Sequence, residues 1–248
     1  MKKLLYIIIL IGLFSCDSED ANDCFQTSGE TVQEEITVAT FNRILVNRNV
    51  QLILKDDIAT KVVVESGKNL INDVEIKVEN SKLIITDNNT CNYARDYAPT
   101  KVHVTSSDIS EIRTSSQFEV LSDGVLSYNN LTLLSEDYNG GSEFTVGDFR
   151  LQLDCNRVRV TSNNISSFYL SGTTNNLSVG FFAGTGRFEG ANLIAEHVEV
   201  NHRGSNDMIV NPQQELTGVL RGTGNVISVN QPPVVTVERL YTGELIFW

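Results

Sequence analysis

The three histidines are the side chains best suited to bind a metal ion or to transfer a proton near neutral pH. His197 and His202 lie five residues apart, so on one continuous strand they would point to opposite faces. They could share a metal ion with Asp207 only across a turn, and His103 is remote in the sequence. The spacing favours surface histidines beside a turn and predicts no metal site.

Enzymes that cleave polysaccharides need clustered carboxylates and often a basic side chain that takes a proton. Asp137, Asp154 and Asp207 fall at different positions of the sequence repeat described below, so they form no carboxylate trio. No Gly-x-Ser-x-Gly motif and no phosphate-binding loop with its lysine occurs either. We therefore expect no catalytic residue and no cofactor, and a polysaccharide-processing enzyme stays as an alternative.

Five residues are candidates for a ligand surface. Arg203 and Arg221 each precede a Gly-Ser or Gly-Thr corner, so stacked side chains could clamp a carboxylate, or cover apolar surface and pair with nearby acids. Phe181 and Phe182 are adjacent, so one of them must face outward if both lie on a strand. Tyr138 lies in a polar stretch typical of a loop. Exposed rings and arginines suit a contact surface, although rings also cap the corners of a fold.

The first sixteen residues resemble a lipoprotein export signal. Two lysines precede an apolar stretch, Leu4 to Phe14, which is too short for a membrane helix of about 20 residues. The segment around Cys16 resembles the lipobox of bacterial lipoproteins, because Leu13 lies three positions before the cysteine and Ser15 directly precedes the cysteine. We expect residues 1–15 to be removed and Cys16 to carry acyl chains, worth about 0.8 kcal/mol per buried CH₂ group. A plain signal peptide with an incidental cysteine is the alternative.

Residues 16–35 are polar and acidic, and we expect them to form a tether. The acidic run after Cys16 resembles the signal that sends Bacteroidetes lipoproteins to the cell surface, and a solvated tether explains it equally. In an oxidising compartment a disulfide is expected, and we favour Cys24–Cys91 because both lie in polar, irregular segments. Cys155 follows a strand-like segment and is expected to be buried.

From Ile36 onward the sequence is typical of short β-strands, with a helical turn indicated only at residues 67–72. In the second half, a polar corner repeatedly precedes an apolar residue. These apolar residues are Phe118, Phe144, Phe168, Phe188, Met208, Val226 and Leu245. A repeat of about 20 residues is too short for a propeller blade of about 40. It favours a right-handed parallel β-helix, or solenoid, over residues 36–248, with an antiparallel sandwich as the alternative.

The formal net charge is −12, and removal of two lysines with residues 1–15 would leave the mature chain at −14. Such a chain repels phosphate backbones, so nucleic-acid binding is disfavoured. With no basic patch to attract anionic headgroups, we expect membrane attachment through the lipid alone.

Residues 36–248 resemble the head GIN-domain family of auto-transporter adhesin-like lipoproteins from Bacteroidetes. The resemblance lies in the order of five segments: residues 41–46, 50–54, 61–65, 69–70 and 82–85. It implies a β-helical fold and an adhesin role, and it brings no catalytic or binding residues. We therefore expect a lipid-anchored, cell-surface binding module of the outer membrane, non-catalytic, with a glycan or extracellular protein as partner. A periplasmic structural lipoprotein is a further alternative.

Overall fold

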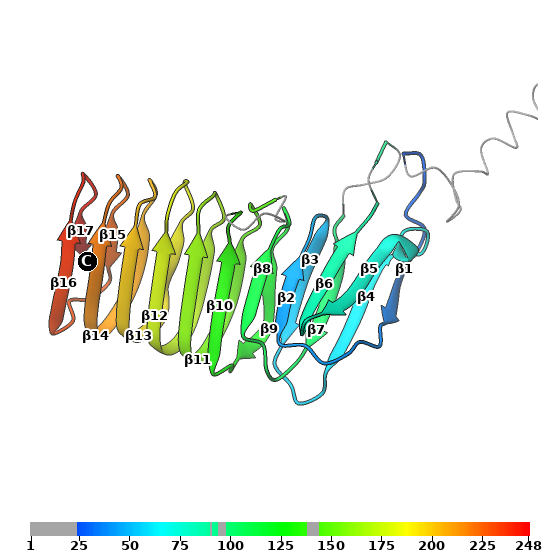
Figure 1. Ribbon diagram of the computed structural model, residues 1–248, viewed down its shortest axis with the longest axis horizontal. Coiled ribbons are helices and arrows are strands. Elements are labelled where there is room, and N and C mark those ends of the chain that lie inside the picture. The colour runs from blue at the N-terminus through cyan, green and yellow to red at the C-terminus, as the bar shows by residue number, and fades with distance from the viewer. Residues whose placement is uncertain (1–23, 90, 94–97, 138–143) are drawn as a thin grey trace, which may run out of the picture.

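The computed structural model describes residues 24–89, 91–93, 98–137 and 144–248. The described chain is all-β, with seventeen strands and one short 3-10 helix, η1 (Ile71–Asp73). The strands lie side by side along one long axis, and β1 and the C-terminus are at opposite ends (Figure 1). No helix in the described ranges is long and apolar enough to cross a membrane.

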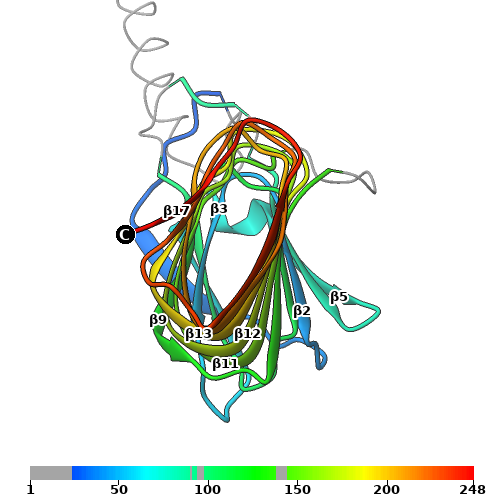
Figure 2. The ribbon, with the colours of Figure 1, turned by 90° about the vertical axis from the view of Figure 1, so that its left-hand side faces the viewer.

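The hydrogen-bonded strands form two rows that meet at the long strands β11–β14. The first row runs in the order β5 (Val74–Glu79), β6 (Lys82–Asp87), β2 (Arg43–Val46), β8 (Glu111–Thr114), β10 (Asn130–Ser135), β11 (Phe149–Ser162), β12 (Phe168–Phe181), β13 (Phe188–His202), β14 (Met208–Leu220) and β16 (Val234–Arg239). The second row runs in the order β1 (Thr31–Glu35), β4 (Lys61–Gly67), β7 (Thr100–Thr105), β3 (Val50–Lys55), β9 (Val120–Leu126), β11, β12, β13, β14, β15 (Val226–Ser228) and β17 (Leu245–Phe247). Seen along the axis, the two rows curl around a common interior (Figure 2).

Each long strand contributes its first half to the second row and its second half to the first row. On β11, residues 149–153 pair with β9, whereas residues 157–162 pair with β10. Buried and exposed residues alternate along both halves, and the alternation breaks at Asn156 and Arg157, which are both exposed. Because alternate side chains face opposite sides of a strand, this break is where the strand changes row.

Parallel pairing confirms the sequence repeat in this part of the chain. Phe149 pairs with Phe168, Phe168 with Phe188, and Phe188 with Met208. Each partner lies one repeat further along the sequence, and the rings of Phe149 and Phe168 stack with centroids 4.8 Å apart. These buried side chains form one continuous ladder through the core.

Two of the predicted apolar positions are wrong. Val120 and Phe149, rather than Phe118 and Phe144, begin the strands that pair in this ladder. Phe118 is half-buried and Phe144 is 42% exposed. For Phe144 the reason is that the connection between β10 and β11 is longer than the later connections, so the first apolar residue after its corner does not yet lie on the strand. The connection before β9 is no longer than the later ones, and the structure gives no such reason for Phe118.

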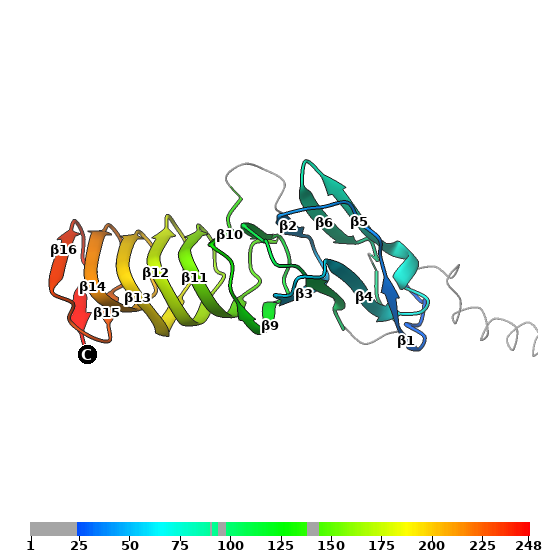
Figure 3. The ribbon, with the colours of Figure 1, turned by 90° about the horizontal axis from the view of Figure 1, so that it is seen from below.

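The N-terminal strands depart from the parallel β-helix that the sequence predicts for residues 36–248. Strand β2 lies between β6 and β8, and three pairings are antiparallel: β1 with β4, β4 with β7, and β5 with β6. A two-residue turn joins β5 to β6, and its Asn80 and Ser81 both have positive φ. That conformation suits a tight hairpin, which forces the antiparallel direction. Figure 3 shows this part at the end opposite the C-terminus.

Candidate binding surface

The outward side of the first row carries a groove that crosses several strands. On β11, the exposed Arg157 and Arg159 alternate with the buried Val158 and Val160, so both arginines point outward. The register then places Asn176 and Ser178 beside them on β12. Because strands repeat at about 4.8 Å, outward side chains form columns along the long axis.

These columns line two open depressions that share both arginines. The larger has a volume of about 280 Å³ and extends from Arg157 and Arg159 across β12 and β13 to Glu215 and Thr217 on β14. The smaller, of about 250 Å³, extends back over β10 at Asn130 and Thr132. The groove is thus elongated along the axis, as an extended ligand would require.

The same outward side continues to the corner where the long strands end. Backbone hydrogen bonds prolong the parallel ladder past the strand ends: Arg203 donates to the carbonyl of Phe181, and Arg221 to that of His202, both at 2.7 Å. Phe182, Arg203 and Arg221 therefore occupy the same position on successive layers, and all three are exposed. Three of the five residues expected from the sequence thus come together.

The other two candidates fall elsewhere. Phe181 is fully buried, whereas its neighbour Phe182 is 48% exposed, as their adjacency requires. Tyr138 lies outside the described residues, as do Cys16 and the whole of residues 1–15. Sequence reasoning missed Arg157 and Arg159. The Arg-Val-Arg-Val alternation at 157–160 indicates an outward pair, but only the register shows that the pair shares a side with Arg203 and Arg221.

The positive charge of this surface comes from four arginines. No acidic side chain of the described residues lies within ion-pair distance of Arg157, Arg159, Arg203 or Arg221. Other arginines are paired, as Arg113 is with Glu136 at 2.6 Å. We name Arg157, Arg159, Phe182, Arg203 and Arg221 the arginine face. Guanidinium groups on an outer surface can donate bidentate hydrogen bonds to a carboxylate or sulfate.

The acidic residues of the groove lie at its other end. Glu215 contacts His197, with Nδ1 and Oε2 3.2 Å apart. The Ser178 hydroxyl donates to Glu199 at 3.5 Å, at the limit of a hydrogen bond. The groove therefore changes from cationic at β11 to acidic at β13 and β14, which would orient a ligand of uneven charge.

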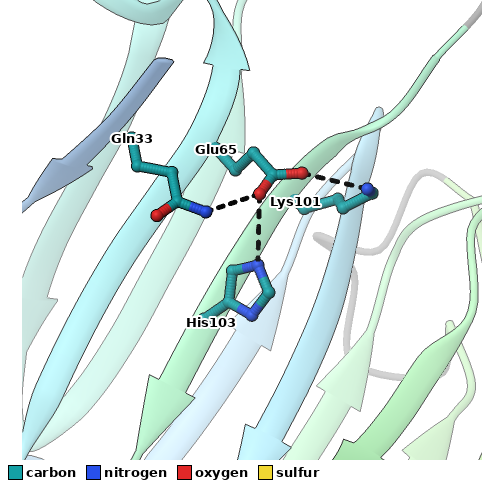
Figure 4. Close-up of polar contacts among 4 residues, drawn as sticks. All are labelled: Gln33, Glu65, Lys101 and His103. Carbon is teal, nitrogen blue, oxygen red and sulfur yellow. Dashed lines mark hydrogen bonds and ion pairs between the residues drawn. The ribbon is translucent and has the colours of Figure 1, made fainter. Parts of the chain in front are cut away.

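A second polar cluster, drawn in Figure 4, lies on β1, β4 and β7, at the end of the molecule away from the C-terminus (Figure 1). Glu65 on β4 accepts a hydrogen bond from Gln33 on β1 at 2.7 Å and contacts Lys101 on β7 at 2.9 Å. His103 lies 3.9 Å from the same carboxylate. The Gln33 hydrogen bond, followed by that of Lys101, lowers the pKa of Glu65. Because the cluster joins three neighbouring strands, we interpret it as a tie that holds β1 to the sheet.

The cysteines follow the expected arrangement. A disulfide joins Cys24 to Cys91, and Cys155 is a buried free thiol. Burial raises the pKa of the Cys155 thiol to about 11, so it is poorly suited to act as a nucleophile. Within the described residues, no three side chains of His, Cys, Asp or Glu are grouped so that they could hold a metal ion.

Solved structures with the same fold come from Bacteroides and Parabacteroides species. The chain is similar to a putative adhesin from Bacteroides fragilis NCTC 9343, with 20% identity and a TM-score of 0.78, over 90% of this chain and 99% of that one. It is also similar to a putative adhesin (16% identity, TM-score 0.61) and a putative lipid binding protein (16% identity, TM-score 0.59), both from Parabacteroides distasonis ATCC 8503. Each comparison covers 89% of this chain, and 99% and 97% of the other chain respectively.

No curated protein sequence matches the chain. The family model named putative auto-transporter adhesin, head GIN domain, matches residues 40–232. That span includes the arginine face and all the long strands that position it. The chain therefore belongs to the head GIN-domain family.

Proposed function

We propose that this protein is a lipid-anchored binding module on the outer surface of the cell, with no catalytic activity of its own. The observation that carries the proposal is the arginine face, an extended outward surface with four arginines that lack ion-pair partners among the described residues. Such groups are available to an external ligand. Membership of an adhesin-like family supports the same function.

The anchor in this proposal is Cys16, with residues 1–15 removed and residues 16–35 forming an acidic tether whose last part pairs with β4 as strand β1. Strand β1 and the C-terminus lie at opposite ends of the molecule, so an N-terminal anchor would direct the long strands away from the membrane (Figure 1). The partner is then a glycan or an extracellular protein, not a nucleic acid, because the chain is strongly acidic.

For the fold, we propose a right-handed parallel β-helix over the long strands. The in-register parallel pairing of successive layers, from β11 through β15 and β17, supports this interpretation. Parallel crossovers are almost always right-handed. The N-terminal strands, with their antiparallel pairings, would close the first end of that helix.

Protease treatment of intact cells tests the location. We expect the band on an immunoblot to disappear without permeabilisation of the outer membrane, and a Cys16→Ser variant to leave the membrane fraction. A periplasmic marker protein serves as the control, because it must stay intact until the membrane is permeabilised. Protection of this chain until that point would contradict surface display and support a periplasmic structural role instead.

A further inference from the structure

The two arginine pairs of the arginine face lie at the two ends of a diagonal across the outward side. Arg157 and Arg159 are on β11, about 7 Å apart along the strand, as outward neighbours are. Arg203 and Arg221 follow β13 and β14, at a position four residues beyond the column of Arg159, or about 13 Å along the strands. The two arginine pairs are therefore too far apart for one small anion and are suited to a long ligand with several charges.

An exposed aromatic ring lies between the two pairs. Phe182 follows β12, and its ring covers Gly180: a Cβ atom built on this glycine would lie 2.8 Å from the ring. The ring is held against the backbone of the sheet while Phe182 remains 48% exposed. A ring fixed in this way offers an apolar platform, and the apolar face of a sugar packs well on such platforms.

The two glutamates of the groove lie off this diagonal. Glu199 and Glu215 occupy the columns of Arg159 and Arg157 on β13 and β14, away from Phe182, Arg203 and Arg221. An anionic chain that crosses from Arg159 to Arg221 over Phe182 avoids both carboxylates, whereas one that follows the groove straight along β13 and β14 meets them. The positions of the arginines and glutamates thus favour the path over Phe182 for an anionic chain.

We propose that the arginine face binds an acidic polysaccharide, whose carboxylate or sulfate groups contact the two arginine pairs while a sugar ring packs on Phe182. This inference rests on the proposed binding function and names its ligand class. A double-stranded nucleic acid would carry more negative charge past Glu199, Glu215 and a chain of net charge −12, so it fits less well.

Binding of purified, detergent-solubilised full-length protein to immobilised heparin, chondroitin sulfate and alginate tests the proposal, with dextran as the neutral probe. We expect binding to at least one acidic polymer and none to dextran. Removal of either arginine pair, in Arg157→Ala/Arg159→Ala or in Arg203→Ala/Arg221→Ala, should weaken binding at least 10-fold, since charge-assisted hydrogen bonds are lost. Phe182→Ala should weaken polymer binding while leaving competition by inorganic sulfate unchanged.

A matched control removes two positive charges elsewhere. Lys55 and Lys68 are exposed and lie outside the arginine face, so Lys55→Ala/Lys68→Ala gives the same change in net charge. This variant should bind as the unchanged protein does. Unchanged thermal unfolding of all variants would show that loss of binding is local.

Three outcomes overturn the inference. They are absence of binding to every acidic polymer, equal loss of binding in the lysine control, or full competition by inorganic sulfate alone, which would mean a small-anion site. Binding to a neutral glycan or an extracellular protein in place of acidic polymers would remove this inference but keep the proposed binding function. Binding to an acidic polymer by a protein that proves periplasmic would support the inference and contradict the surface location.

Discussion

His202 is the one histidine whose side chain is fully buried among the described residues. Its Nε2 lies 2.7 Å from the carbonyl oxygen of Asn206, and its ring packs edge-on against Phe181. Its Nδ1 is buried and has no hydrogen-bond partner in the described part of the chain. A neutral ring that donates from Nε2 satisfies this site, whereas protonation would place an unpartnered N–H at Nδ1.

Acidification should therefore destabilise the protein through His202. Burial lowers the pKa of this histidine below 6.5, so the unfolded chain takes up the proton first as pH falls. Stability from the neutral ring is complete above the unfolded pKa and is lost as pH falls from about 6.5 toward the folded pKa. Thermal unfolding from pH 8 to pH 5 should show a larger fall in Tm for the unchanged protein than for His202→Leu. Equal pH dependence of the two proteins would contradict this role, because His202 is the only side chain by which they differ.

At the scale of single strands, close stacking of backbones imposes glycine at Gly172. This residue has φ +105°, and a Cβ atom there would lie 1.9 Å from the carbonyl oxygen of Leu153 on β11. Gly124 has a similar φ of +91°, but a Cβ atom there would meet nothing within 4 Å. An added side chain would strain the backbone at both positions, but it would overlap a neighbouring strand only at Gly172.

Gly172→Ala should lower the free energy of unfolding by about 1–3 kcal/mol more than Gly124→Ala, because only the first variant forces two layers apart. Chemical denaturation of both variants beside the unchanged protein measures the difference. Equal losses would mean that the positive φ alone matters and that the layers adapt to an added methyl group.

Contacts of the Glu65 side chain also act between single strands. Its carboxylate joins β1, β4 and β7, and Glu65→Ala should cost about 1 kcal/mol of stability and free β1 first. Because the pKa of Glu65 is lowered in the fold, this contribution is present above about pH 4.5 and is lost as pH falls through the folded pKa. Hydrogen exchange of the β1 amides is the measurement.

Glu35 provides the control for the tie. It also joins β1 to β4, through Lys61 at 2.8 Å, but both side chains are about half exposed, and such surface pairs contribute little. Glu35→Ala should therefore leave the exchange of β1 nearly unchanged. Exchange of the β1 amides as fast in Glu35→Ala as in Glu65→Ala would contradict the role given to the Glu65 carboxylate.

The strands themselves were predictable to a large extent from the sequence. Alternating apolar residues and polar corners indicate the all-β class and a short sequence repeat, because both are local patterns. Phe144 shows the limit: the connection between β10 and β11 is longer than the later ones, so Phe144 stops short of the strand, and no local pattern shows which apolar residue enters the ladder. The position of β2 between β6 and β8 depends on contacts between distant residues and could not be predicted either.

For the molecule as a whole, the disulfide links the beginning of the described chain to the segment before β7. Cys24 and Cys91 close a loop with a sequence separation of 67 residues, which contains β1 to β6. The sequence favoured this pair from its polar surroundings, whereas the arginine face needed the register of four strands before its residues could be grouped.

Replacement of the disulfide in Cys24→Ser/Cys91→Ser should lower the free energy of unfolding by about 2–4 kcal/mol, since a long loop is no longer closed in the unfolded chain. Denaturation in guanidinium chloride measures this loss, and addition of a reductant to the unchanged protein should reproduce it. A reductant effect that persists in the double variant would have to come from another cysteine.

The parallel ladder of β11 to β14 also bears on how this protein could change over evolutionary time. Each layer contacts mainly the layers directly before and after it, so duplication of one such layer would lengthen the molecule without altering any existing neighbour. Every added layer would extend the reach by about 4.8 Å. Descendants of one ancestral gene could therefore differ in length by whole layers while keeping the same two ends.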